Sequence, residues 1–183
     1  MSEPRPTTAT EILRDAFGRV ADELPAALAG LDADTLLWRP DPDANSIGWL
    51  AWHLTRVQDD HLAGVGDVEQ VWQTMGFERE FQLPYAVESI GYGHSSADVG
   101  AFQMTDVDLL CRYHAAVHEL TLRVLDGLEA GGAPAYARIV DRRWDPPVTA
   151  AVRLVSVIGD TTAHLGQIGY LRGMAERRTA VRP

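Results

Sequence analysis

Six histidines, at positions 53, 61, 94, 114, 118 and 164, are the side chains of this sequence best suited to metal chemistry. Asp160 and His164 are four residues apart in a stretch with helical periodicity, so both project from one helix face on successive turns. Aspartate is a poor residue in the middle of a helix, and a carboxylate on an apolar face must be paired or ligated. The spacing therefore predicts either two ligands for one divalent ion or an ion pair on the helix surface.

Two further candidates involve other histidines. His114 and His118, in the sequence His-Ala-Ala-Val-His, have the same spacing and form an equally good pair of ligands. Glu119 beside His118 indicates a more solvated position for that histidine, so we treat this pair as the secondary candidate. His53 lies one turn after Trp49 at the edge of an apolar helix face, and its surroundings alone favour a packed histidine over a ligand.

The net charge of the chain limits the classes of partner that it can be expected to bind. The basic residues number 16, all of them arginine, against 26 acidic residues, which gives a formal net charge of −10. A chain this acidic, without a large basic cluster, is repelled by the phosphates of nucleic acids and by anionic membranes, so we expect neither as a partner. The absence of lysine excludes mechanisms that use a Schiff base or a P-loop lysine.

The remaining composition bounds the fold class and the kind of metal site. The single cysteine, Cys111, excludes an internal disulfide and a cysteine-rich zinc site, so histidines and carboxylates must hold any bound metal. With 183 residues, 46% of them hydrophobic, the chain can bury a core, and we expect one domain over residues 1–183. No apolar run has the length of a membrane span or the pattern of a signal peptide, so we expect a soluble, cytoplasmic protein.

Apolar residues recur every three or four positions in four long stretches, which predicts four helices and an all-α fold. The predicted helices cover residues 10–30, 45–63, about 105–129 and about 148–173. Asn45 has N-cap chemistry for the second helix, and Gly131 and Gly132 are expected to end the third. Residues Asp59–His61 continue the second helix, and we interpret them as its solvated face. Since no segment alternates like a strand, we expect a four-helix bundle over about 8–173 with disordered ends.

The segment 65–104, between the second and third predicted helices, differs from the rest of the chain. Its periodicity fades, glycines and Pro84 interrupt it, and aromatic residues are spread along it at positions 72, 77, 81, 85, 92 and 102. A connection of roughly forty residues is far longer than a pair of helices needs, and such connections usually have a function or cover another part of the molecule. We therefore expect a long, aromatic-rich crossover.

Two short motifs carry a resemblance to a known family. The second helix contains Ile47-Gly48-Trp49-Leu50-Ala51-Trp52-His53-Leu54, and the fourth contains Thr162-Ala163-His164-Leu165-Gly166-Gln167. Together they resemble the DinB-like superfamily of four-helix metalloproteins, over most of the chain from the first helix to about Gly173. Within it, the chain is most similar to the actinobacterial branch, close to mycothiol-dependent maleylpyruvate isomerase and bacillithiol transferase. The resemblance implies helices in an up-down-down-up order, which requires a long connection between the second and the third.

The resemblance also implies a metal site. Similar members of the superfamily bind a divalent ion, often zinc or nickel, through one histidine of the second helix and two residues of the fourth. On this sequence the three positions are His53, Asp160 and His164. Asp160 stands where the commonest members have a third histidine. Two imidazoles and one carboxylate leave coordination positions open for water or for a substrate sulfur.

The neighbours of these three positions are candidates for the mouth of the site. Trp49 and Trp52 precede His53 on the same helix and are placed to form a wall. Arg56 lies about one turn beyond His53, where it is a candidate to meet an anionic group of a bound molecule. A purely structural role in packing is the alternative for all three side chains, and the sequence favours it. Gln167, about one turn after His164, is a candidate hydrogen-bond partner for a ligand.

The activity implied by the resemblance is a thiol-dependent transferase or isomerase that acts on small electrophiles. In the thiol-transferase members the ion binds a low-molecular-weight thiol, here mycothiol or a similar one, and presents it as a thiolate. The partners would be this thiol, an electrophile and a second copy in a homodimer. One alternative is a non-catalytic, metal-binding bundle with a structural or sensing role. Another is an ion-free bundle in which Asp160 and His164 pair with each other and the crossover serves dimerisation.

Overall fold

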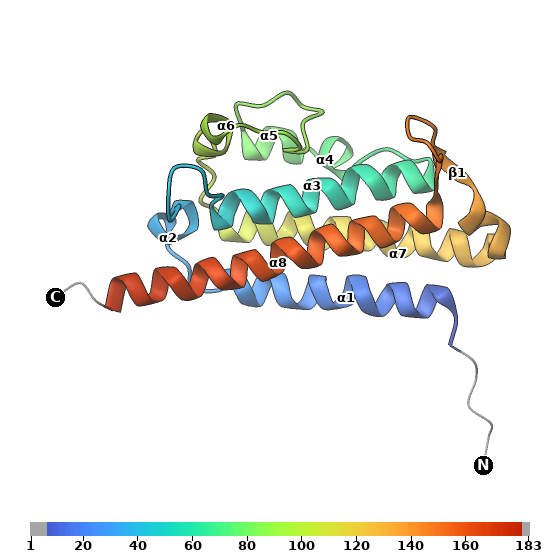
Figure 1. Cartoon of the computed structure of the whole chain (residues 1–183), viewed down its shortest axis with the longest axis horizontal. Coiled ribbons are helices and arrows are strands. Elements are labelled where there is room, and N and C mark those ends of the chain that lie inside the picture. Colours follow the sequence, from blue (N-terminus) through green and yellow to red (C-terminus); the bar gives the residue numbers. More distant parts are fainter. Residues whose placement is uncertain (1–6, 181–183) are drawn as a thin grey trace, which may run out of the picture.

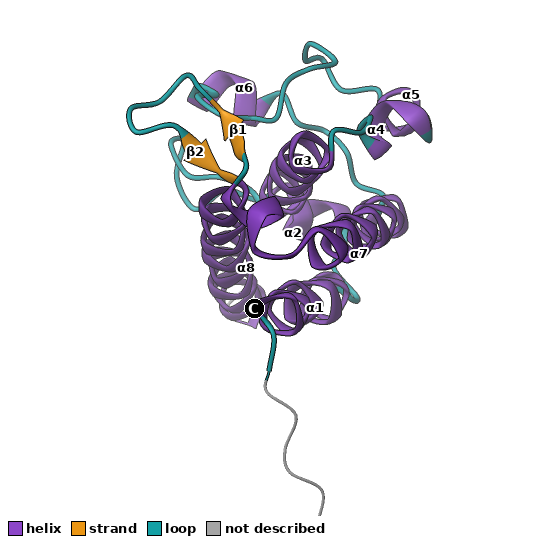
Figure 2. Cartoon of the chain, turned by 90° about the vertical axis from the view of Figure 1, so that its right-hand side faces the viewer, coloured by secondary structure: helices purple, strands orange, loops and turns teal. Residues whose placement is uncertain are grey.

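Four long helices form an antiparallel bundle in the computed structural model, which describes residues 7–180, with side chains as far as Arg178. They are α1 (Ala9–Leu28), α3 (Ile47–Gly66), α7 (Val107–Ala137) and α8 (Ala150–Ala180). Helices α1 and α8 run in one direction and α3 and α7 in the other (Figure 1). Viewed end on, α3 lies diagonally opposite α1, with α8 on one side and α7 on the other (Figure 2). The all-α four-helix bundle and its up-down-down-up order are thus confirmed.

Short elements fill the connections. The long crossover between α3 and α7 is confirmed, and it contains three helices of one turn or slightly more: α4 (Val71–Thr74), α5 (Phe77–Phe81) and α6 (Ser96–Gly100). Helix α2 (Ala33–Leu37) lies in the loop between α1 and α3. The prediction that no strand forms was wrong, because β1 (Ile139–Asp141) and β2 (Val148–Thr149) pair antiparallel before α8.

The helix ends show which polar residues act as caps. Thr8 and Glu11 form a capping box at the start of α1, and Ser46, not Asn45, caps α3 by accepting from the backbone N–H of Trp49. The third long helix is interrupted at the predicted glycine pair. Gly132 leaves the helical conformation with a φ of 62°, and a second, short run of helical turns follows it to Ala137. Helix α8 continues to Ala180, so the prediction of a disordered end after Gly173 was wrong for residues 174–180. The rest of the predicted disorder falls on residues outside the described range.

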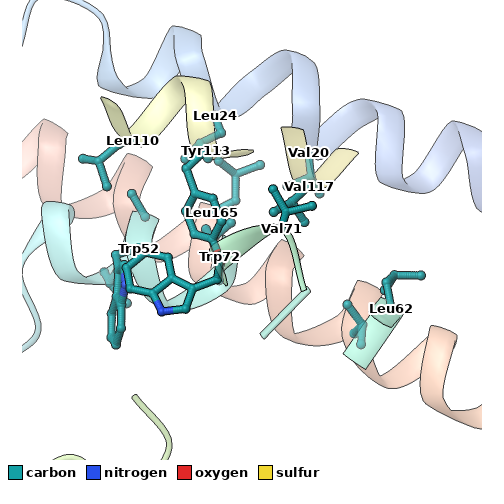
Figure 3. Packing of buried hydrophobic residues seen from close by; sticks show 14 of the residues in the cluster. Val20, Leu24, Trp52, Leu62, Val71, Trp72, Leu110, Tyr113, Val117 and Leu165 are labelled. Carbon is teal, nitrogen blue, oxygen red and sulfur yellow. The ribbon is translucent and has the colours of Figure 1, made fainter. Parts of the chain in front are cut away.

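Helix α3 is enclosed on nearly all sides, since the crossover covers the face that the other long helices leave open (Figure 2). Trp72 of the crossover lies against Tyr113 of α7, with ring centroids 5.2 Å apart (Figure 3). This burial of apolar surface gives the crossover a fixed position on the bundle. No helix among the described residues has both the length and the apolar character that a bilayer span requires.

The interpretation of Asp59–His61 as a solvated face of α3 is wrong for Asp59. Its side chain is fully buried, and its two carboxylate oxygens accept from the backbone N–H groups of Val71 and Trp72, at 2.9 and 2.8 Å. The Tyr113 hydroxyl donates to the same carboxylate at 2.9 Å. Asp59 therefore caps the first turn of α4 and ties the crossover to the bundle. The next two residues of α3 are half-buried.

Candidate metal centre

The structure brings the three predicted ligands together from opposite ends of the sequence. His53 lies on α3, while Asp160 and His164 lie one turn apart on α8, which packs against α3. One ligand atom of each of the three side chains lies within 4.8 Å of those of the other two. The imidazole rings of His53 and His164 meet edge to face, with centroids 4.9 Å apart. The three donors thus converge on a single point between two helices.

Both imidazoles are held with the same ring nitrogen facing the other ligands. The Nδ1 atom of His53 lies 2.5 Å from the backbone carbonyl oxygen of Ile90, and because a carbonyl only accepts, Nδ1 carries the proton. The Nδ1 atom of His164 donates in the same way to Oε1 of Gln167 at 2.9 Å. In the neutral form of each ring Nε2 therefore keeps its lone pair, which is the arrangement found in histidines that bind metals.

Asp160 has an oxygen that the surrounding protein does not satisfy. Its Oδ1 lies 3.5 Å from Nε2 of His164, whereas its Oδ2 is buried and has no hydrogen-bond partner among the described residues. A buried carboxylate oxygen without a partner is costly unless a cation or a proton compensates it. Two imidazole nitrogens and one carboxylate oxygen match the ligands that zinc and similar divalent ions prefer. These residues therefore fit a divalent ion.

The protonation of His53 and Asp160 favours cation binding near neutral pH, whereas that of His164 opposes it. Burial lowers the pKa of His53 below its usual range, so this imidazole is neutral. Burial acts to raise the pKa of Asp160, but the hydrogen bond and charge of His164 outweigh it, and the net pKa lies below the ordinary value. The hydrogen bond to Asp160 raises the pKa of His164, so a metal ion must displace any proton shared within this pair.

A turn of the crossover approaches His53 closely at Gly91. This residue has a φ of +86°, and a Cβ atom there would lie 2.7 Å from Nδ1 of His53. The same Cβ would lie 3.0 Å from the rings of both Trp49 and Trp52. A residue without a side chain is therefore required next to the carbonyl that orients His53. Neither Gly91 nor the carbonyl of Ile90 was among the sequence candidates, and the only signal available was a glycine in a long connection.

The residues predicted to form the mouth of the site are more buried than expected. The ring of Trp49 stacks on His53, with centroids 4.6 Å apart and planes inclined by 17°, and Trp52 is almost fully buried. Arg56 lies in the interior and not at an opening. Its Nε donates to the carbonyl oxygen of Ser89 at 3.2 Å, and its Nη1 lies 3.6 Å from the carboxylate of Asp59. Arg56 thus holds the crossover immediately before the turn that orients His53.

The secondary pair, His114 and His118, does not join the three converging ligands. His114 is fully buried on α7, and its Nδ1 lies 3.1 Å from the hydroxyl oxygen of Thr55. His118, for which a more solvated position is predicted, is half-buried. Cys111, one turn earlier, is half-buried, and burial raises the pKa of its thiol. A raised pKa keeps this thiol protonated near neutral pH.

A cavity of about 550 Å³ opens beside the converging ligands. His53 and Asp160 line one end of it, and apolar side chains of α3, α8 and the crossover line its middle. Arg143 of the β1–β2 turn and Arg153 of α8 lie among the lining residues, together with His61. Such a volume accommodates a small organic molecule next to His53 and Asp160.

Comparisons with known proteins agree with this architecture. Residues 16–168 match the family model of the DinB superfamily, a segment that contains all three candidate ligands. Among solved structures, a conserved protein from Enterococcus faecalis is similar, with a TM-score of 0.82 and 27% sequence identity, over 91% of this chain and 96% of that chain. A search of curated proteins found no match. Because the family match spans most of the chain, from α1 into α8, this protein belongs to the DinB superfamily.

Proposed function

We propose that this protein is a metal-dependent transferase or isomerase that uses a low-molecular-weight thiol, mycothiol or a similar one, against small electrophiles. The observation that carries the proposal is the convergence of His53, Asp160 and His164 beside a cavity. Three protein ligands leave coordination positions open, as catalytic sites require, whereas purely structural zinc sites use four. DinB superfamily membership and the unpartnered oxygen of Asp160 support a divalent ion, zinc or nickel, at this point.

The chain's own residues have distinct roles in this proposal. His53 and His164 offer Nε2 atoms that are already oriented by their Nδ1 hydrogen bonds, the second of them after the proton shared with Asp160 has left, and Asp160 supplies negative charge. When bound, a divalent ion supplies Lewis acidity that lowers the pKa of a coordinated thiol. Trp49 and the turn at Gly91 cover His53 and limit the access of water from that side.

The position of Cys111 supports an external thiol. This cysteine lies on α7, is not among the residues that line the cavity, and has a thiol pKa raised by burial. The sulfur nucleophile would therefore come from a small molecule in the cavity. Mycothiol is the proposed source, since exclusive use of arginine with abundant alanine and glycine is typical of the GC-rich genomes of actinobacteria.

Metal content of the untagged full chain is the first test. Inductively coupled plasma mass spectrometry should give about one equivalent of a divalent ion per chain. His53→Ala and His164→Ala should lose the ion while keeping the helical circular-dichroism signal, because each removes one donor without disturbing the core. His118→Ala is the matched control and should keep the ion. Full metal in both ligand variants would refute the site and point to His114 and His118.

Thiol-dependent turnover is the second test. The metal-loaded protein should conjugate a chromogenic electrophile only when a low-molecular-weight thiol is added, and His164→Ala should lose this activity. A protein that binds one equivalent of metal but gives no rate above that of the free thiol, over a panel of thiols and electrophiles, would instead be the non-catalytic metal-binding bundle.

A further inference from the structure

The cavity beside the candidate metal centre is elongated along two helices. On α8, Arg153 precedes Asp160 by seven residues, which places it two turns away on the same face, about 10.5 Å along the helix axis. On α3, His61 follows His53 by eight residues, and the two helices run in opposite directions (Figure 1). Both pairs line the same cavity, so its far end lies about two helical turns from the metal ligands.

The far end of the cavity holds two guanidinium groups that share one carboxylate. The backbone N–H, Nε and Nη2 of Arg143 all donate to Asp141, at 2.9, 3.0 and 2.9 Å. Nη2 of Arg153 donates to the same carboxylate at 2.8 Å. The other acid here, Asp60, accepts from Gln70 and lies 3.1 Å from Nδ1 of His61.

This arrangement leaves guanidinium donors available to a ligand. Arg143 donates three hydrogen bonds to Asp141 and Arg153 donates one, whereas Nη1 of Arg153 makes only a long contact of 3.5 Å to His61. The side chain of Arg143 is 84% exposed and keeps free donors at the opening. Guanidinium donors match the geometry of carboxylates and phosphates better than any other side chain.

The walls between the two ends are apolar or aromatic. Val57 of α3 and Val157 of α8 line the middle of the cavity, and Ile90 closes it from the crossover. Two aromatic side chains at its edge are unusually open to solvent, Tyr92 at 87% and Trp144 at 61% exposure. They come from different segments, the crossover and the turn between β1 and β2, which lies beside α3 and α8 (Figure 2). Exposed aromatic side chains at the rim of a cavity are suited to cover a ligand's apolar part.

We propose that the cavity binds an elongated small molecule whose reactive end lies at the metal centre and whose other end is an anionic group, a carboxylate or phosphate, held by Arg153 and Arg143. This inference rests on the proposed function and narrows its substrate class. The anionic group belongs either to the thiol or to the electrophile, and the chemistry that recognises it is the same in both cases.

A length series of thiols tests the proposal in the cobalt-substituted full chain. Coordination of a thiolate to cobalt is followed by its charge-transfer absorbance, with ω-mercaptoalkanoic acids compared with ω-mercaptoalkanols of equal length. The acids should bind about tenfold more tightly than the alcohols at an intermediate length, since a charge-assisted hydrogen bond is stronger than a neutral one. Arg153→Met and the exposed Arg143→Met should remove this preference and leave alcohol binding unchanged.

Arg142 provides the matched control, because it is an exposed arginine next to Arg143 that does not line the cavity. Arg142→Met should retain the preference for acids. Equal affinity for acids and alcohols at every length, or a preference that survives in both Arg153→Met and Arg143→Met, would overturn the proposal. With a neutral thiol, turnover of bromoalkanoates against bromoalkanamides then assigns the anionic group to the electrophile or to the thiol.

A metal-free measurement separates this inference from the proposed function. Titration of the metal-free chain with alkanoates, followed by nuclear magnetic resonance of the arginine Nε–H groups and of the Trp144 indole, should shift the signals of Arg143, Arg153 and Trp144. If alkanoates shift these signals but no thiol binds to the cobalt protein, the proposed thiol chemistry is refuted and the anion site stands. The absence of shifts at these three residues would overturn the anion site whatever the metal does.

Discussion

The imidazoles of His53 and His164 are oriented by acceptors of different kinds. His53 donates to a main-chain carbonyl in the crossover, whereas His164 donates to the side chain of Gln167 one turn later on α8. Partners of this kind fix the tautomer and the ring orientation, and their loss commonly lowers metal affinity ten- to a hundredfold, roughly. Gln167 is exposed, so its role can be tested by mutation without disturbing the core.

Gln167→Leu should weaken metal binding about tenfold, because the leucine removes the acceptor that holds His164 in its ligating tautomer. Gln167→Glu keeps an acceptor in the same place and should bind at least as tightly as the wild type. Competition against a chromophoric chelator measures both affinities. Equal metal affinity in the leucine and glutamate variants would show that the ring of His164 is oriented without this hydrogen bond.

Side-chain spacing made part of the candidate site predictable. Asp160 and His164 were found from their separation by one helical turn, and His53 from the motif that resembles the DinB-like family. The carbonyl of Ile90 could not be found in this way, since every residue has a carbonyl and only the path of the crossover places this one against His53. Arg56 was misplaced because one helix face was expected to be open, while the crossover covers it.

At the level of whole elements, the position of the crossover depends on one buried carboxylate, that of Asp59. Asp59 of α3 caps α4 and also accepts from Tyr113 of α7, so three elements meet at one carboxylate. Arg56, also fully buried, lies beside it and extends toward the turn at Ser89. These two buried side chains therefore serve both the stability of the crossover and the position of the turn that contacts His53.

Asp59→Ala should lower the free energy of unfolding by about 3–5 kcal/mol, because it leaves the buried guanidinium of Arg56 without its carboxylate. Urea denaturation measures this change. The neighbouring Asp60→Ala removes a partly exposed carboxylate and should cost less than about 1 kcal/mol. A loss at Asp59 as small as that at Asp60 would mean that the capping and ion-pair contacts add little to stability.

His114, at the interface of α7 with α3, should make stability depend on pH. Burial, with a smaller contribution from His118, lowers its pKa from 6.5 to about 4. Between these values the unfolded chain binds a proton that the folded state does not, so stability is complete above about pH 6.5 and falls as the pH drops toward 4. The loss is on the order of 3 kcal/mol by about pH 4. Thr55 already occupies Nδ1, and Nε2 has no partner among the described residues to stabilise a positive charge.

His114→Gln should reduce this pH dependence, since glutamine does not titrate. Urea denaturation of both proteins at about pH 7 and about pH 4, in the presence of a chelator to remove metal effects, gives the difference. The wild type should lose on the order of 3 kcal/mol more than the variant. Parallel pH profiles would show that His114 titrates normally and is more accessible to water than its burial indicates.

Helical periodicity predicted the long helices because each buries one face over several turns. It did not predict β1 and β2, since strands of three and two residues are too short to show alternation. It also misjudged Asp59, because a helix in contact with both a bundle and a crossover has no solvated face along part of its length. Burial of a helix face by a segment that is distant in the sequence leaves no pattern in the sequence of the helix itself.

In the whole molecule, a bound ion would link the two helices that make the most extensive contact. Ligands from α3 and α8 exist together only in the folded state, so metal binding should stabilise the protein by mass action. At a free ion concentration about a hundred times the Kd, the expected gain of about 2.7 kcal/mol raises Tm by about 5–10 °C. Thermal scans with added zinc or nickel measure it, and a chelator should reverse it. His164→Ala should melt at the same temperature with and without the ion, and an equal shift in that variant would locate binding elsewhere.

The up-down-down-up order has a consequence for how the protein is made. His53 lies on α3, whereas Asp160 and His164 lie on α8, which leaves the ribosome after the other three long helices of the bundle. A nascent chain that already contains α1, α3 and α7 holds only one of the three ligands, and it has no stable partner for the face of α3 that α8 covers. We therefore expect the ion to be acquired only after α8 has been synthesised, so that a metal-loaded molecule is also one in which α8 has docked against α3.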